Sequence, residues 1–201
     1  ETDGDYLAII HSNVGGGKTD QGMTQDVQKF VKIDDLGRQI TTLRITRTNA
    51  AKNEQYFPKN VDFMRVFVPM ASKILNANGF DPVEFRPSVL AGASTDRDLA
   101  AWDAKIQRDW NTGVYVGYEA DHTVFMGWLE VDAAHHKTVE LTYELPVRGP
   151  AYSLLLQTQP GAREFQFDLE VQAPHEIIYQ YPERIIPEVI SEDRFYAVIG
   201  Q

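Results

Sequence analysis

The chain has 201 residues, of which 43% are hydrophobic and 24% charged, and its formal net charge is -10. A globular chain of this length can bury a core without covalent cross-links. The acidic balance and the lack of a dense Lys/Arg cluster exclude a nucleic-acid-binding surface of the usual basic kind. Because the sequence contains no cysteine, disulfides, thiolate metal ligands and a cysteine nucleophile are excluded as well.

No stretch approaches the roughly 18 consecutive apolar residues that a transmembrane helix needs. The chain opens with ETDGDYLAII, a strand-like run that no signal peptide precedes. This abrupt start predicts a fragment of a longer exported protein. No Ser/Gly-rich or Pro-rich linker divides the sequence, so we expect residues 1–201 to form a single domain.

Alternation of apolar and polar residues, which is typical of half-buried strands, dominates the chain. VQKFVKI at 27–33 and ITTLRIT at 40–46 flank the turn sequence DDLGR and predict a hairpin. Ile40 is out of phase with the residues that follow it, which predicts a bulge near the turn. MRVFVPM at 64–70 has apolar residues on both faces, so we expect a strand that is covered on both sides and ended by Pro69.

One segment departs from this alternation. STDRDLAAWDAKIQRDWN at 94–111 carries Leu99, Trp102, Ile106 and Trp110 at helical spacing. We expect a short amphipathic helix near 95–111 that packs its apolar stripe onto the strands.

Residues 124–146, VFMGWLEVDAAHHKTVELTYELP, contain two alternating runs around a short polar loop and predict a second hairpin. His135 and His136 fall in that loop. Adjacent residues of a strand point to opposite faces, and no H-x-x-x-H or H-E-x-x-H spacing occurs, so the pair does not suit a zinc site. We interpret the two histidines as the tip of the hairpin.

Further alternating runs, AYSLLLQTQ, FQFDLEVQA and RFYAVIG, follow towards the C-terminus. Segment 177–190 contains Pro182 and Pro187 and suits an edge strand or an irregular strap. Together these patterns predict an all-β fold. We expect a two-sheet antiparallel β-sandwich, immunoglobulin-like or jelly-roll-like, with the single inserted helix.

No pattern predicts a catalytic residue, a cofactor or a metal site. NVGGGKTD at 13–20 lacks the first glycine of a phosphate-binding loop, and no G-x-S-x-G elbow offers a serine nucleophile. Acidic pairs such as Asp34 and Asp35 suit turns better than a glycosidase cleft. The five histidines suit structural or exposed positions.

Two further possibilities stay open. The loops ETDGD and STDRD are rich in oxygen ligands that calcium prefers, although neither matches an EF-hand. An intramolecular isopeptide bond would stabilise such a sandwich. Lys73, Lys137 and Asn13 are candidates for it, but no spacing selects them.

Aromatic residues are the remaining candidates for a ligand-binding site. Trp102, Trp110 and Trp128, with Tyr179 and Tyr181, could form a platform on which sugar rings stack. Packing in the core of a sandwich explains most of these residues equally well.

Four stretches resemble, in order, the C-terminal region of the bacterial family named domain of unknown function 4012. They are DYLAIIHSNVGGGKTD (5–20), FMRVFVPMASKIL (63–75), TVFMGWLEVDAAHHKTVELTYELP (123–146) and YSLLLQTQPG (152–161). The sequence departs from the family pattern at Met126, where glycine is usual, and at DAAHHK, where a Pro-Gly-Glu turn is more common. The resemblance implies a membrane-anchored bacterial surface protein with extracytoplasmic domains, and it implies no catalytic residue.

We therefore expect a non-catalytic extracellular structural, adhesion or binding domain of a bacterial cell-envelope protein. Its partner would be a cell-envelope polysaccharide or another protein. The alternative is a carbohydrate-binding module that uses exposed aromatic residues. A less favoured reading is an envelope-processing hydrolase, which would need a buried titratable cluster in a cleft.

Overall fold

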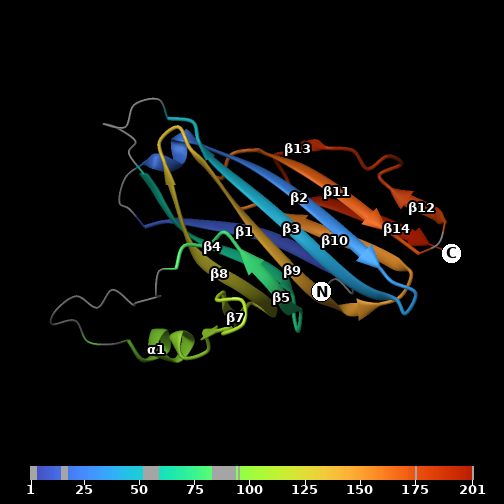
Figure 1. Cartoon of the computed structure of the whole chain (residues 1–201), viewed down its shortest axis with the longest axis horizontal. Helices are drawn as coiled ribbons and strands as arrows, with labels where there is room; N and C mark the ends of the chain where they lie inside the picture. Colours follow the sequence, from blue (N-terminus) through green and yellow to red (C-terminus); the bar gives the residue numbers. More distant parts are fainter. Residues whose placement is uncertain are drawn as a thin grey trace.

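The computed structural model describes residues 4–14, 18–51, 59–82, 94, 96–174 and 176–200, apart from the side chains of Leu99, Trp102 and Asp103. In these ranges the chain forms two β-sheets that pack face to face, and β2, β3 and β11 lie across β1, β10 and β14 (Figure 1). No helix in the described ranges is long and apolar enough to cross a membrane.

The larger sheet has eight strands in the order β12-β14-β10-β1-β4-β8-β7-β6. Their bounds are β1 (Asp5–Asn13), β4 (Lys59–Pro69), β6 (Gln107–Arg108), β7 (Tyr115–Glu119), β8 (His122–Asp132), β10 (Ala151–Gln157), β12 (Ile177–Tyr181) and β14 (Arg194–Gly200). The smaller sheet has six strands in the order β13-β11-β2-β3-β9-β5. Their bounds are β2 (Met23–Ile33), β3 (Arg38–Asn49), β5 (Lys73–Asn78), β9 (His136–Arg148), β11 (Phe165–Gln172) and β13 (Glu188–Ile190).

The predicted all-β sandwich is confirmed, with one correction to its pairing. Most neighbouring strands are antiparallel as expected, but each sheet contains a parallel pair, β1 with β10 and β2 with β11. Both sheets are therefore mixed. The described strands also outnumber the seven to nine or so of an immunoglobulin domain and the eight or so of a jelly roll.

The predicted first hairpin is confirmed as β2 and β3, with Val27 opposite Ile45. Its turn is held by the Asp34 carboxylate, which accepts hydrogen bonds from the backbone N–H groups of Leu36 and Arg38. The predicted bulge is confirmed too. The register of β3 against β9 shifts between Arg38 and Ile40.

The main core lies between the sheets and takes inward side chains from both. Phe125 of β8 and Tyr143 of β9, for example, face each other with ring centroids 5.5 Å apart. A second cluster lies on the outer face of the larger sheet, around Phe63, Val124 and Met126. Strand β4 contributes to both clusters, which confirms the prediction that it is covered on both sides.

The predicted hairpin at 124–146 is wrong. Strand β8 belongs to the larger sheet and β9 to the smaller one, so the DAAHHK loop carries the chain from one sheet to the other. The inward faces of β8 and β9 meet across the core and do not share a hydrogen-bonded ladder. In the loop, the His135 N–H donates to the carbonyl of Asp132, and the Asn49 N–H donates to the carbonyl of His135.

The predicted helix is present but shorter than expected. It is α1 (Arg97–Asp103), and residues after it form β6 and a turn that leads into β7. The Asp109 carboxylate accepts hydrogen bonds from the backbone N–H groups of Asn111 and Thr112, and this fixes the turn. Ile106 packs in the second cluster, and Trp110 lies in the turn, so neither extends a helical stripe.

Segment 177–190 joins the sheets at their edges, as its prolines predicted. It contributes β12, which pairs with β14 at an edge of the larger sheet, and β13, which pairs with β11 at an edge of the smaller one. Short 3-10 helix η1 (Thr19–Gly22) precedes β2.

Gly127 gives a test of the packing between the sheets. An added Cβ at Gly127 would lie 2.4 Å from Cδ1 of Phe80, whose ring occupies that space. We expect Gly127→Ala to lower the free energy of unfolding by about 1–3 kcal/mol, because the ring must move. Urea denaturation measures this change. Gly200→Ala is the control, since its Cβ would meet nothing closer than 3.5 Å. Equal effects of both changes would contradict the packing described here.

Candidate functional site

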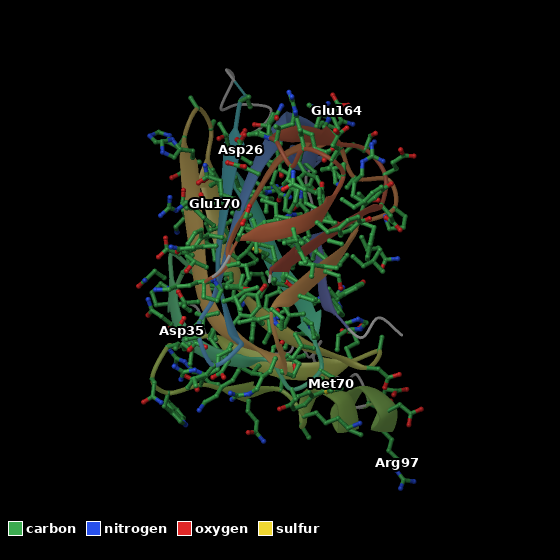
Figure 2. All side chains as sticks on the ribbon, turned by 90° about the vertical axis from the view of Figure 1, so that its right-hand side faces the viewer. Asp26, Asp35, Met70, Arg97, Glu164 and Glu170 are labelled. Carbon is green, nitrogen blue, oxygen red and sulfur yellow. The ribbon has the colours of Figure 1, made fainter. Side chains whose placement is uncertain are left out.

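A cleft of about 440 Å³ opens between the two sheets at one end of the strands. Its walls are the last residues of β1, β3, β10 and β13, the first residues of β2 and β11, and the loop 158–164. In Figure 2, Asp26 of β2 and Glu164 of the loop lie at this end of the molecule, near the top of the view, whereas Met70 and Arg97 lie near the bottom. The cleft thus lies where the inward faces of the sheets reach solvent.

His11 and Asp62 form a nearly buried pair in this end of the sandwich. His11 Nδ1 lies 2.5 Å from Asp62 Oδ2, and their side chains are 11% and 1% exposed. The other carboxylate oxygen, Oδ1, accepts a hydrogen bond from the backbone N–H of Ser12 at 2.9 Å. Neighbouring strands β1 and β4 therefore hold the imidazole in one orientation.

Two glutamine side chains contact the other ring nitrogen and the backbone of His11. Nε2 of its ring lies 2.6 Å from Oε1 of Gln25, which comes from β2 in the opposite sheet. The side chain of Gln159 accepts a hydrogen bond from the His11 backbone N–H and donates one to its carbonyl. The histidine is thus fixed by groups from both sheets and from the loop that forms one wall.

Arg47 places a nearly buried positive charge at the cleft. Its side chain is only 8% exposed, and its Nη2 donates a long hydrogen bond of 3.5 Å to Asp20. Its Nε–H has no acceptor among the described residues. Burial lowers the pKa of the guanidinium, while the carboxylates of Asp62 and Asp20 oppose that shift. Because an arginine stays charged at any physiological pH, the cleft keeps a cation with unused donors.

The remainder of the cleft wall mixes polar and apolar residues. Its apolar side chains are those of Ile9, Met23, Leu156, Phe165 and Ile190. Small-molecule sites usually combine apolar side chains with a few convergent polar groups. The volume of the cleft also lies in the range of about 300–1,000 Å³ that such sites occupy.

The chemistry of the cluster favours binding over catalysis. A His–Asp pair can act as a general base, but the free ring nitrogen must then reach a nucleophile or a water. Here Nε2 of His11 is engaged by Gln25, and no hydroxyl of the described residues bonds to the ring. In the described ranges, no group of three or more His, Asp or Glu side chains is arranged to hold a metal ion.

The structure places two of the three tryptophans predicted as ligand-binding, Trp110 and Trp128, in different surroundings. Trp128 is partly buried and packs in the second cluster, with its ring centroid 5.0 Å from that of Phe63. Trp110 is 85% exposed, and its ring is contacted by the guanidinium of Arg108. The side chain of Trp102 lies outside the described residues.

Tyr179 and Tyr181, predicted as part of the same platform, instead lie with Phe195 and Ile199 on the outer face of β12 and β14. Tyr179 is opposite Ile199, and the rings of Tyr181 and Phe195 are 6.3 Å apart. Both tyrosines are 52% exposed and Phe195 is 47% exposed. Since β12 and β6 are opposite edges of one sheet, this aromatic face is far from the turn that carries Trp110.

The remaining sequence candidates have ordinary roles or lie outside the described residues. His135 is exposed in the loop between the sheets, and His136 is exposed at the start of β9. Lys137 pairs with Asp81, and Lys73 is exposed. The three glycines of the phosphate-loop-like stretch, and parts of ETDGD and STDRD, lie outside the described residues.

Sequence reasoning missed the residues that line the cleft, although a signal was present. His11 follows Leu7 and Ile9 in phase on β1, Gln25 stands between Met23 and Val27, and Arg47 follows Ile45. A polar residue at an inward position of a strand must find a partner inside the protein. The alternation could have identified these inward polar residues. It could not have identified their partners, because each partner comes from a different strand.

The Asp62 carboxylate offers a test of this network. Asp62→Ala leaves Arg47 buried beside fewer negative charges and removes the acceptor of His11, so we expect a loss of about 3–5 kcal/mol in the free energy of unfolding. Urea denaturation followed by tryptophan fluorescence measures it. Asp132→Ala removes an exposed carboxylate 3.8 Å from Lys59 and should cost less than about 1 kcal/mol. Similar losses for both variants would refute the buried network.

Comparisons with known proteins do not assign the chain to a family. No family model and no curated protein matches the sequence. Among solved structures, a candidate nutrient-binding protein from Legionella pneumophila matches with a TM-score of 0.43 and 8% identity, over 98% of this chain and 71% of that one. A zinc metallopeptidase of the M1 type from Deinococcus radiodurans matches with a TM-score of 0.29 and 9% identity, over 90% of this chain. The chain spans 43% of the peptidase's length. Likenesses this weak carry no argument about activity or ligand.

Proposed function

We propose that this chain is a non-catalytic, extracellular binding domain of a bacterial cell-envelope protein, and that the cleft between its sheets holds an anionic group of a cell-envelope polysaccharide. The cellular setting comes from the resemblance of the sequence to a bacterial surface-protein family. The choice of the cleft comes from its side chains. The cellular setting and the choice of the cleft therefore rest on different observations, and an experiment can refute one without the other.

The observation that carries the cleft proposal is the guanidinium of Arg47. It is nearly buried, its Nε–H has no acceptor among the described residues, and its one hydrogen bond to Asp20 is long. Because this Nε–H is closed to solvent, the side chain must turn before an acceptor in the cleft recovers the free energy that the missing partner costs. A carboxylate or phosphate oxygen satisfies a guanidinium best, because the planar N–H donors match its geometry.

Charge and shape support the same class of ligand. The chain as a whole is acidic, with a formal net charge of -10, so a small anionic group is attracted only where a cation is concentrated. The guanidinium groups of Arg47 and Arg163 line the cleft, together with the carboxylates of Asp20 and Glu164. The apolar side chains of the wall suit the face of a sugar ring that carries C–H groups, beside that anionic group.

The aromatic face on β12 and β14 supports a second candidate, a carbohydrate-binding module. Tyr179, Tyr181 and Phe195 are about half exposed on one side of the sheet, and solvent-exposed apolar patches of this kind mark interaction sites. Stacking on this face would bind neutral polysaccharide and would not need Arg47. The two candidates thus use different residues and different ligands.

The hydrolase reading has one supporting feature, because His11, Asp62 and Arg47 are the buried titratable cluster in a cleft that it requires. Against it, the ring nitrogen that a general base needs is engaged by Gln25. A binding site explains the same cluster and does not require Gln25 to leave the imidazole of His11.

Co-sedimentation of the purified protein with isolated bacterial cell walls and with insoluble neutral polysaccharides tests these candidates. We expect saturable binding to walls that contain anionic polymers and at least a tenfold weaker affinity for Arg47→Met, because a good charge-assisted contact is worth about 1.5–3 kcal/mol. Arg44→Met is the matched control, since Arg44 lies on the same strand, is about half exposed and points to the other face. Circular dichroism confirms that each variant is folded.

A double variant, Tyr181→Ala with Phe195→Ala, separates the second candidate from the first. Binding that is lost in the double variant and kept in Arg47→Met would assign the function to the aromatic face. If Arg44→Met weakens binding as much as Arg47→Met does, the interaction depends on the net charge of the protein and not on the cleft. No binding to any wall or glycan would contradict both candidates.

A further inference from the structure

An ion pair is enclosed between the two sheets, away from the cleft. Nζ of Lys29, on β2, lies 2.8 Å from Oδ2 of Asp5, on β1, and both side chains are 0% exposed. Nζ also donates to the hydroxyl oxygen of Tyr143 at 2.8 Å, and the hydroxyl of Tyr152 donates to Asp5 Oδ2 at 2.8 Å. Lysine is among the residues that are almost never fully buried, so the buried position of Lys29 is unusual.

We propose that Lys29 and Asp5 react with each other to form an amide bond that joins the two sheets. The bond links Nζ of Lys29 to Cγ of Asp5 and releases one molecule of water. No oxidant or other co-reactant is needed. The cross-link would give a chain without cysteine a covalent tie between its two layers, which disulfides give to other secreted domains.

Burial of Lys29 favours its neutral amine, which is the nucleophile that the step needs. A lysine ammonium and a carboxylate are strongly destabilised when both are removed from water, and transfer of one proton from Nζ to the carboxylate leaves an amine and a carboxylic acid. Burial lowers the pKa of Lys29, although its attraction to Asp5 opposes that shift. A neutral amine next to a neutral carboxylic acid is the pair that can form an amide.

The two tyrosines and one backbone amide are placed to assist the step. The backbone N–H of Tyr6 donates to Asp5 Oδ1 at 2.8 Å, which marks Oδ1 as the oxygen that remains in the amide carbonyl. Nζ attacks Cγ, and Oδ2 leaves as water after it has received two protons that began on Nζ. The hydroxyls of Tyr143 and Tyr152, which are bonded to the amine and to Oδ2, are positioned to relay the second proton. Burial raises the pKa of both tyrosines, so both hydroxyls keep their protons.

Proximity supplies much of the driving force. Strands of opposite sheets hold the two groups in contact, so the reaction is intramolecular, and well-oriented groups reach very high effective concentrations. The released water leaves an apolar interior for solvent. Buried neighbours of the pair, Leu7 on β1 and Val27 and Val31 on β2, belong to the main core and exclude water that would reverse the reaction.

Intact mass spectrometry of the denatured chain of residues 1–201 tests the proposal. We expect a mass lower than that of the sequence by one water molecule, and Lys29→Met at its full sequence mass. Asp5→Asn should instead lose one ammonia molecule, because its amide nitrogen becomes the leaving group. Trypsin should leave Lys29 uncut and yield residues 1–18 joined to residues 19–32.

Lys29→Met also separates the cross-link from other losses of water, such as cyclisation at Glu1 or at the Asp3–Gly4 step. A wild-type mass equal to that of the sequence would overturn the proposal, as would a water loss that persists in Lys29→Met. Neither result depends on a variant that folds, because Lys29→Met lacks the reacting amine whether or not it folds.

Discussion

The removal of charged and polar side chains from water between the two sheets is the constraint on which the rest of this structure depends. Lys29 on the smaller sheet meets Asp5 on the larger one, and His11 on the larger sheet meets Gln25 on the smaller. A buried charge that loses its partner costs several kcal/mol. Any slip of one sheet over the other would separate both pairs at once, so these contacts specify the relative position of the sheets in a way that apolar packing alone does not.

The same constraint explains why the cleft lies where it does. Through the middle of the sandwich the inward positions are filled by side chains such as Val31, Leu43 and Leu141, which pack without regard to direction. At the end where β1 and β3 finish, polar residues take the inward positions and need directed partners. Arg47 is incompletely satisfied there. That end of the sandwich therefore keeps a buried donor that the described residues do not satisfy.

Local patterns in the sequence predicted some elements well for identifiable reasons. The hairpin of β2 and β3 was predictable because its turn is made by neighbouring residues, with the Asp34 carboxylate bonded to N–H groups two and four positions away. The stretch 124–146 has equally clear alternation, but the pattern says only that each strand has one inward face. Whether two successive strands share a ladder or face each other across a core depends on the other strands that compete for their edges.

The amino-acid sequence by itself determined the all-β class, most strand positions, the bulge near Ile40 and the inward phase of His11 and Arg47, and it limited segment 177–190 to an edge strand or an irregular strap. These features depend on neighbours close in the chain or on the period of two residues along a strand. Only the tertiary structure decided that β8 and β9 belong to different sheets, that the helix ends at Asp103, and that Asp5 meets Lys29 and Asp62 meets His11. Those outcomes join residues from separate strands, and the free energy that selects them comes from the burial of many groups together rather than from any local pattern.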